Sequence, residues 1–139
     1  KGLVGAIRSK QSVDIRHRSM NPKREEMMWR TITPHAFGHD GLRWHVRAHC
    51  HIDRIFKNFV LSRCQAVGAM GAAGAKAEDD LEWHSYLDVH LEPNPKLTER
   101  QRRTIAFDYD MPDGRVTIRV RRALLYYFNK RLRARPQAS

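Results

Sequence analysis

Alternating apolar and polar positions in the first half of the chain predict short β-strands. From Val13 onward, apolar side chains at 13 and 15 face one way while Asp14, Arg16 and Arg18 face the other. Strands of this kind are expected at residues 13–18, 29–33, 42–51 and 56–65. The second is expected to end at Pro34, which cannot donate a hydrogen bond to a ladder.

A short helix within residues 1–12 is expected to precede these strands, with Leu3, Val4, Ala6 and Ile7 on one side. The strands are joined by polar connections, and no helical pattern separates them. This order indicates a small antiparallel barrel or a strongly bent sheet, because an open sheet of this size would leave its edges exposed.

The second half of the chain has a different pattern. Residues 68–80 are rich in glycine and alanine and end in an acidic run, so a flexible linker is expected there. The elements predicted after it are a strand at 83–92, a helix at 98–107, a strand at 115–121 and a helix at 123–132. Thr98 followed by Gln101 is a capping-box signature for the first of these helices. Residues 81–139 therefore indicate a small α+β domain.

The segment from Arg43 to His51 is the most unusual of the predicted strands. One face consists of apolar side chains, namely Trp44, Val46, Ala48 and Cys50. The other face consists of hydrogen-bond donors, namely His45, Arg47, His49 and His51. A strand face with this single type of chemistry suits an anionic ligand, although a solvated basic face would have the same pattern.

Charge changes the functional picture more than overall composition does. The net charge is +11, with 14 Lys/Arg against 5 Asp/Glu in residues 1–76 and 8 against none in residues 114–139. Residues 77–113 between these blocks are acidic, with 4 against 10. Two basic blocks favour a polyanionic partner, most commonly a nucleic acid.

The remaining composition bounds the setting of the protein. The chain has 139 residues, enough for one ordinary domain or two small ones, and no apolar run long enough to span a bilayer. Two cysteines are too few for a disulfide scaffold, so a cytoplasmic location is expected. The chain starts at Lys1 without a methionine, which suggests a fragment of a longer protein.

Three sequence blocks, in this order, resemble the WYL domain of bacterial transcriptional regulators. They are RTITPH at 30–35, RWHVRAHC at 43–50 and FKNFVLSR at 56–63, with Trp-His-Val at 44–46 in the place of the eponymous Trp-Tyr-Leu. Downstream, LEPNP at 91–95, DY at 108–109 and RRALL at 121–125 are similar to the C-terminal extension called WCX. The form with His and Val is most similar to the phage-defence-associated regulators of BREX- and CBASS-type operons.

The resemblance implies a fold and a role. The implied fold class is mainly β plus α+β, with an Sm-like or SH3-like antiparallel β-barrel over residues 13–67 and a ferredoxin-like α+β domain over 81–139. The implied role is effector sensing within a homodimeric regulator that binds operator DNA through an N-terminal winged helix-turn-helix outside this chain. In relatives the effector is a nucleic acid such as single-stranded DNA. No membrane partner and no cofactor are expected.

The resemblance also implies which side chains face the ligand. The ligand-facing residues it implies are Ser19, Arg30, His35, His45, Arg47 and Arg63, with Phe59 framing them. Trp44, on the apolar face of its strand, is expected to pack in the core. Because His45 stands where the family has tyrosine, binding is expected to depend on pH. Arginine suits phosphate because its planar fork of donors matches anion oxygens.

Other readings of the same residues remain open at this stage. A zinc site from the histidines at 45, 49 and 51 with Cys50 is disfavoured, because Cys50 faces away from them and no standard ligand spacing occurs. Ser19, His35 and Asp40 could form a hydrolytic triad, but no nucleophile elbow or oxyanion loop accompanies them, so an enzyme is not expected. A constitutive Sm-like RNA- or DNA-binding module and a pure oligomerisation fragment are the alternatives to a sensor. The basic face of residues 115–121 could complete the effector groove, contact DNA, receive an acidic segment of a partner subunit, or simply be solvated.

Overall fold

The computed structural model describes residues 2–20, 22–127 and 132–136. The chain divides into two compact units, residues 1–80 and residues 81–139. Each is described by itself below, as unit 1 and unit 2. The class expected from the sequence, mainly antiparallel β-structure with few helices, is confirmed in both units. Among the described helices, none is long and apolar enough to cross a membrane.

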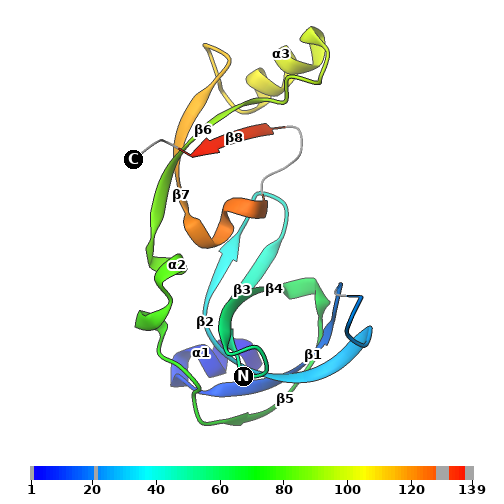
Figure 1. Ribbon diagram of the computed structural model, residues 1–139, viewed down its shortest axis with the longest axis vertical. Coiled ribbons are helices and arrows are strands. Elements are labelled where there is room, and N and C mark those ends of the chain that lie inside the picture. Colours follow the sequence, from blue (N-terminus) through cyan, green and yellow to red (C-terminus); the bar gives the residue numbers. More distant parts are fainter. Residues whose placement is uncertain (1, 21, 128–131, 137–139) are drawn as a thin grey trace. The chain divides into compact units, whose positions relative to one another are not determined.

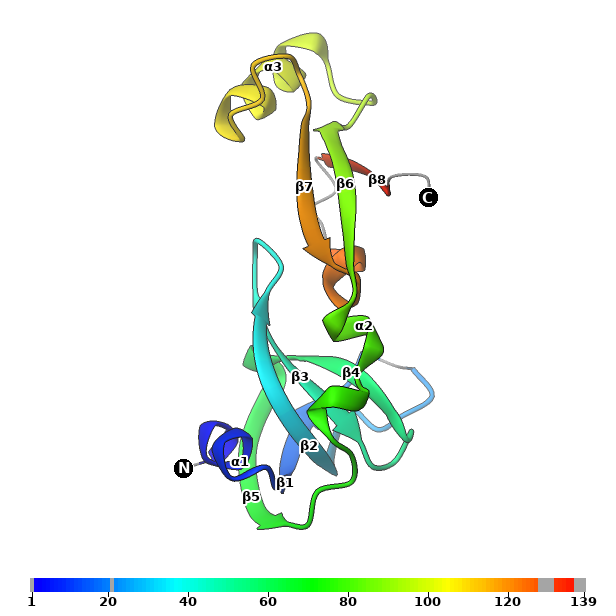
Figure 2. The same ribbon diagram turned by 90° about the vertical axis from the view of Figure 1, so that its left-hand side faces the viewer.

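Unit 1 is a single five-stranded antiparallel sheet with a short helix packed against it (Figures 1 and 2). Its elements in chain order are α1 (Gly2–Ser9), β1 (Ser12–Arg18), β2 (Met27–His39), β3 (Trp44–Cys50), β4 (Ile55–Val60), the 3₁₀ turn η1 (Leu61–Arg63), β5 (Cys64–Gly71) and the 3₁₀ turn η2 (Ala77–Asp79). The strand order is β4-β3-β2-β1-β5. The strands bend around a common centre, as Figure 1 shows, so side chains on the inner face converge.

The sheet differs from the predicted strands in two places. β2 does not end at Pro34 but continues to His39, with an irregularity in its pairing to β3 between Pro34 and Ala36. A bulge of this kind lets a strand pass a proline that cannot donate. The strand expected at 56–65 is two strands, because η1 interrupts it and β5 then pairs with β1.

Unit 1 has a contiguous core on the inner face of the sheet. The buried residues that form it are Leu3, Ala6, Val13, Ile15, Ile32, Val46, Ala48, Cys50 and Phe59. The prediction that Trp44 belongs to this core is wrong, because its side chain is 53% exposed. Trp44 lies at the start of β3, where its partner is His39 at the end of β2, and its ring meets the His39 ring edge-on at 5.0 Å.

The glycine- and alanine-rich segment is more ordered than a flexible linker. Gly68 and Gly71 belong to β5, so only residues 72–80 follow the last strand of unit 1. The backbone N–H of Gly74 donates to the Thr33 hydroxyl at 2.9 Å, and the Asp80 carboxylate is buried at the other end of the segment. We call residues 72–80 the strap, because both of its ends are attached to unit 1.

Unit 2 is a three-stranded antiparallel sheet in the order β7-β6-β8. Its elements are α2 (Leu81–His84), β6 (Tyr86–Pro93), α3 (Glu99–Asp108), β7 (Val116–Arg121), the 3₁₀ helix η3 (Arg122–Tyr127) and β8 (Leu132–Pro136). The core contains Val89, Leu91, Ile105 and Met111. The capping box at Thr98 and Gln101 is confirmed, with both of its reciprocal hydrogen bonds present.

Two predicted elements of unit 2 are corrected by the structure. The strand expected from residue 83 is preceded by a helical turn, and Trp83 is buried in that turn. The helix expected at 123–132 is a 3₁₀ helix up to Tyr127, and Leu132 is the first residue of β8; residues 128–131 lie outside the described part. Leu132 pairs with Pro93 across the sheet. The pattern of nearby residues that predicted a helix contains no information about this distant partner.

Candidate anion-binding site

The predicted ligand-facing residues lie on two opposite faces of the unit 1 sheet. Ile32 and Cys50 are direct partners across β2 and β3, so Arg30 shares the inner face with Cys50. Arg47 alternates with Ala48 and therefore lies on the outer face. Arg30 and Arg47, both expected to face the ligand, therefore do not share a face of the sheet.

On the outer face, Arg47 is neutralised by the strap. Its Nε donates to Asp80 Oδ2 at 2.7 Å, and one of its terminal nitrogens donates to Asp80 Oδ1 at 2.9 Å. His35 Nε2 lies 2.8 Å from the same Asp80 Oδ2. Arg47 is only 3% exposed and Asp80 only 1%. Both side chains predicted to meet a ligand here are therefore covered by a carboxylate of the same chain.

His45 has a similar partner near the tip of the β2–β3 hairpin. Its Nε2 lies 2.6 Å from Asp40 Oδ2, and the backbone N–H groups of Leu42 and Arg43 donate to Asp40 Oδ1. Burial opposes ionisation of Asp40, but these hydrogen bonds outweigh it and lower the pKa of the carboxyl to about 2. His45 is fully buried, so it is held inside the protein and not presented to solvent.

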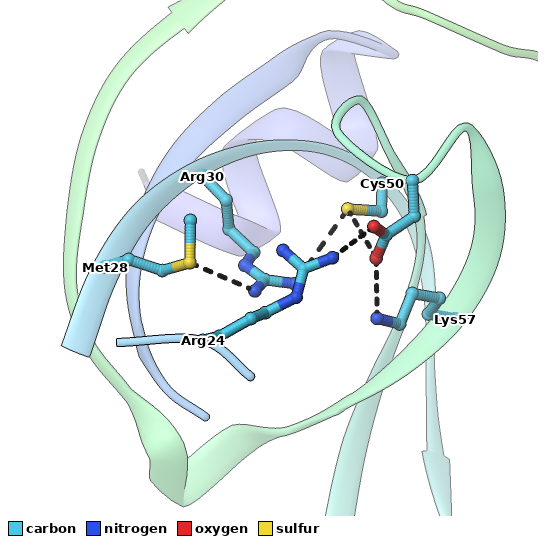
Figure 3. Close-up of polar contacts among 6 residues, drawn as sticks. Arg24, Met28, Arg30, Cys50 and Lys57 are labelled. Atoms are coloured by element: carbon cyan, nitrogen blue, oxygen red, sulfur yellow. Dashed lines mark hydrogen bonds and ion pairs between the residues drawn. The ribbon is translucent and has the colours of Figure 1, made fainter. Parts of the chain in front are cut away.

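On the inner face, a cavity of about 180 Å³ opens where β1, β2 and β4 converge. The residues that line this cavity, which we call the cationic pocket, are His17, Ser19, Met20, Arg24, Arg30, Lys57, Asn58 and Phe59. Figure 3 shows Arg24, Arg30 and Lys57 pointing into the space that the curved strands enclose. Of the predicted ligand-facing residues, Ser19, Arg30 and Phe59 are brought together here.

Arg30 is the most unusual side chain of the cationic pocket. It is 5% exposed, and among the described residues its terminal nitrogens contact two sulfur atoms, Met28 Sδ at 3.5 Å and Cys50 Sγ at 3.9 Å. Its Nε has no hydrogen-bond partner among the described residues. Its charged carbon lies 5.6 Å from the centre of the Phe59 ring. Thioether and thiol sulfur are weak acceptors, and no carboxylate of the described residues pairs with this cation, although buried charges are normally paired.

His17 lies beside Arg30 and lacks polar partners as well. Neither ring nitrogen has a hydrogen-bond partner in the described part of the chain, although the side chain is only 8% exposed. Its ring meets the Phe59 ring edge-on at 5.2 Å. Burial, together with the positive charges of Arg30, Arg63 and Lys57, lowers the pKa of His17 to about 4. The imidazole is therefore neutral at pH 7.

Asp53 is a carboxylate that pairs with two of these cations. Its oxygens accept from Lys57 Nζ at 2.8 Å and from the Arg24 guanidinium. The hydrogen bond from Lys57, followed by the charges of Lys57 and Arg24, lowers the pKa of Asp53 despite its burial. Asp53 thus holds Arg24 and Lys57 in place, while Arg30 keeps an unbalanced positive charge.

A larger cavity of about 410 Å³ lies between α1, β2 and the strap. It is lined mainly by small or apolar side chains, with Lys10 and Lys76 at its border. His35 is the one predicted ligand-facing residue that borders it, and this side chain is already paired with Asp80. The chemistry of this cavity is less specific than that of the cationic pocket.

The sequence prediction omitted several residues of the cationic pocket. His17, Arg24 and Lys57 line the pocket but were not expected to face a ligand. Arg63 was expected to face the ligand, and its positive charge acts on His17. Strand alternation contained the signal for His17, because Val13 and Ile15 were placed inward and His17 has the same parity. Within the described residues, no three His, Cys, Asp or Glu side chains gather in a way that could hold a metal ion.

Comparison with protein families matches both units. Residues 1–68 match the WYL domain, and residues 86–139 match the C-terminal dimerization domain of the BrxR transcriptional regulator. The resemblance seen in the sequence motifs is thereby confirmed.

Two individual relatives are DNA-binding transcriptional repressors. The chain is 39% identical over 128 residues to the DNA-binding transcriptional repressor CapW of Stenotrophomonas maltophilia. The aligned region covers 90% of this chain and 42% of that repressor. The chain is 37% identical over 126 residues to the CapW repressor of Pseudomonas aeruginosa, covering 90% and 41%. This chain thus spans about two fifths of the length of these curated relatives. A solved structure of the proteasome accessory factor B/C of Arthrobacter aurescens aligns with a TM-score of 0.47 and 22% sequence identity. The alignment covers 95% of this chain and 23% of the chain in that structure.

Proposed function

Because this chain belongs to the WYL-domain regulators and joins a WYL domain to a BrxR-type dimerization domain, we propose that it is the effector-sensing and dimerising part of a transcriptional regulator. Its effector is an anionic nucleic acid, such as single-stranded DNA, or a nucleotide, and it binds at the cationic pocket. Operator DNA is bound by a separate module of the same regulator, and the controlled operon belongs to phage defence. The dimerization-domain match supports a homodimer.

The unbalanced charge of Arg30 is the observation that carries this proposal. A buried guanidinium without a carboxylate is costly, and an anion that enters the pocket would remove that cost. Arg24, Lys57 and Arg63 add positive charge around the same point. The buried Phe59 ring lies against Arg30 and Lys57 and forms part of the pocket lining.

For His35, His45 and Arg47 we propose a structural role in place of a ligand contact. Each is paired with a buried carboxylate of this chain, Asp80 or Asp40. Arg47 and His35 attach the strap to the outer face of the sheet, and His45 organises the hairpin tip. A ligand at these positions would first have to displace Asp80 or Asp40.

The Sm-like description of unit 1 also belongs to this proposal. Among the described residues no hydrogen-bonded ladder joins β4 to β5, so the circle of strands is open at that point. The chain passes from β4 through η1 to β5, and β5 pairs with β1; this strand order supports the proposal of an Sm-like or SH3-like arrangement. The ferredoxin-like arrangement of unit 2 stays a prediction.

A charge-matched pair of variants tests the ligand site. Arg30→Gln removes the unbalanced charge from the pocket, while Arg16→Gln removes one charge from an exposed position on the same sheet. We expect Arg30→Gln to weaken binding of a fluorescent oligothymidylate at least about tenfold, because hydrogen bonds to charged groups contribute about 1.5–3 kcal/mol. We expect Arg16→Gln to change it less than about twofold at the same salt concentration. Equal losses in both variants would refute the pocket as the site.

A second experiment tests sensing as distinct from binding. The regulator that contains this chain and its DNA-binding module is titrated onto operator DNA with and without oligothymidylate. Sensing requires that the effector bind one arrangement of the protein more tightly than the other, so operator affinity must change. Unchanged operator affinity with a saturated pocket would favour the constitutive nucleic-acid-binding module instead.

A further inference from the structure

The size of the cationic pocket limits what can enter it. Its volume is about 180 Å³. Pockets that enclose a whole small-molecule ligand measure roughly 300–1,000 Å³. The cationic pocket therefore has room for one charged group of a larger ligand, and the rest of that ligand must lie outside it.

The charge of the pocket indicates which group this is. Arg24 and Lys57 share the carboxylate of Asp53, while Arg30 has no carboxylate partner among the described residues. The positive charge of Arg63 also acts on this region. A phosphodiester inside a strand carries one negative charge, whereas a terminal phosphate monoester carries about 1.5–2 at pH 7. The excess of positive charge matches the monoester better.

His17 supplies a specific contact for such a group. Both of its ring nitrogens are buried and have no partner among the described residues, so their burial carries a desolvation cost. A neutral imidazole has one donor, while an imidazolium has two. A dianion beside the ring would offset most of the positive charge of Arg30, Arg63 and Lys57, and its direct hydrogen bond with the ring would favour the imidazolium.

On the premise that the cationic pocket is the effector site, we propose that it binds the terminal phosphate monoester of a nucleic-acid strand and that His17 takes up a proton to donate to that phosphate. The proton comes from solvent, and no covalent bond forms or breaks. The pocket thus recognises the end of a strand, which distinguishes fragmented nucleic acid from intact nucleic acid.

The groups that face His17 from neighbouring elements keep their charges over the relevant pH range. Across the sheet its partners are Met28 on β2 and Cys64 on β5, and burial raises the pKa of the Cys64 thiol to about 11. The remaining charged groups are the cations Arg30, Lys57 and Arg63 on β2, β4 and η1, together with Arg24, which lines the same pocket and pairs with Asp53. His17 is therefore the protein group here whose protonation a phosphate in the pocket would bring into the range of pH 5 to 8.

Oligonucleotides with different ends test the ligand class. This chain is titrated with a decathymidylate that carries a 5′-phosphate, a 3′-phosphate or hydroxyl groups at both ends, and with inorganic phosphate as competitor. We expect a phosphorylated end to bind about tenfold more tightly or better, since a charge-assisted hydrogen bond of about 1.5–3 kcal/mol is added. Equal affinity for all three strands would overturn this inference and leave the proposed function standing. No binding of any strand at low salt would overturn both.

A direct measurement tests the proton on His17. Its imidazole is titrated by NMR in this chain, alone and saturated with the phosphorylated strand. We expect the His17 pKa to rise by about 1–3 units on saturation, the range produced by an adjacent opposite charge. An unchanged His17 pKa would overturn the proton uptake.

Two substitutions separate this role from packing. His17→Phe keeps a ring against Phe59 but removes both nitrogens, so we expect the preference for a phosphorylated end to be lost while hydroxyl-ended strands bind as before. His39→Gln removes an exposed imidazole of the same unit and should keep the full preference. A His17→Phe variant that retains the preference would overturn the assignment of His17. Because the NMR titration uses the unsubstituted chain, it tests the same point even where His17→Phe does not fold.

Discussion

Arg47 and Asp80 form a bidentate ion pair in which Arg47 Nε lies 2.7 Å from Asp80 Oδ2 and a terminal nitrogen lies 2.9 Å from Oδ1. The two residues are 33 positions apart in the sequence, and both are almost fully buried. The pair attaches the end of the strap to the middle of β3. It turns an arginine that looks like a ligand contact into part of the fold.

Removing one partner of this pair is expected to be costly. Arg47→Met leaves the buried Asp80 carboxylate without its guanidinium, and breaking a buried pair in this way costs about 3–5 kcal/mol. The free energy of unfolding of unit 1 is measured by urea titration, followed through amide NMR signals of β1 to β5. Arg16→Met, at an exposed position, should stay within about 0.5 kcal/mol of the parent chain. A loss below about 1 kcal/mol for Arg47→Met would show that the pair does not hold the strap.

Gly74 is expected to tolerate no side chain. An added Cβ would lie 2.7 Å from Nε2 of His51, and the Thr33 hydroxyl holds that ring at 2.7 Å. Gly74→Ala should therefore push the strap away from the sheet and destabilise unit 1 by about 1–3 kcal/mol, as overpacking does. Faster hydrogen exchange at the amide of residue 74, which donates to Thr33, would report the displacement.

Gly5 provides the matched control for this substitution. It lies within α1, and nothing is found within 4 Å of an added Cβ. Gly5→Ala should be neutral or stabilise unit 1 by up to about 1 kcal/mol, because alanine favours helix. If both glycine substitutions had the same effect, the contact with His51 would not be its cause.

The stability of unit 1 is expected to fall in mild acid because of His17. Its pKa is about 4 in the folded chain, against an ordinary value of 6.5, so the unfolded chain binds more protons between these values. The contribution is present above pH 6.5 and is lost as the pH falls towards 4, with a loss of about 2 kcal/mol at pH 5. Burial also lowers the pKa of His51, so His51 adds to the loss of stability as the pH falls.

A comparison of variants isolates the part that belongs to His17. Unfolding free energies at pH 7.5 and pH 5 are measured for the parent chain and for His17→Phe, and the difference between the two chains is the His17 contribution. Asp40 does not interfere at these pH values, because its pKa is about 2 when folded and its contribution is lost only below about pH 4. An identical pH dependence in both chains would contradict the depressed His17 pKa.

Trp44 and Phe59 are expected to differ sharply in their importance for stability. Trp44 is 53% exposed and has its edge contact with His39, so Trp44→Ala should cost about 1 kcal/mol or less. Phe59 is 2% exposed, and Phe59→Ala should cost about 3–5 kcal/mol. The measurement is urea unfolding of unit 1. Comparable losses would restore Trp44 to the core and contradict the exposure seen here.

Much of the local structure was predictable from short stretches of sequence. The leading helix, the strand at β1 and the capping box at Thr98 and Gln101 follow from residues at most four positions apart. β2 was harder, because Pro34 normally ends a strand and only the bulge with β3 allows the chain to continue. η1 was missed because the sequence from 56 to 65 alternates well enough to read as one strand.

The candidate site was predictable only in part. Motif resemblance pointed to Ser19, Arg30 and Phe59, which do share the cationic pocket. It also pointed to His35, His45 and Arg47, which the structure pairs with carboxylates elsewhere on the sheet. His17 followed from strand parity but carried no motif, so it was not singled out.

The sequence by itself determined which residues of each strand share a face, since side chains alternate along any β-strand regardless of context. It also determined the basic character of residues 1–76, which favours an anionic partner. Only the tertiary structure decided what covers each face. The strap brings Asp80 onto the outer face of β3 and neutralises Arg47, while the curvature of the sheet encloses Arg30 and His17, neither of which pairs with a carboxylate of the described residues. A buried charge depends on its distant neighbours, and alternation along one strand does not reveal them.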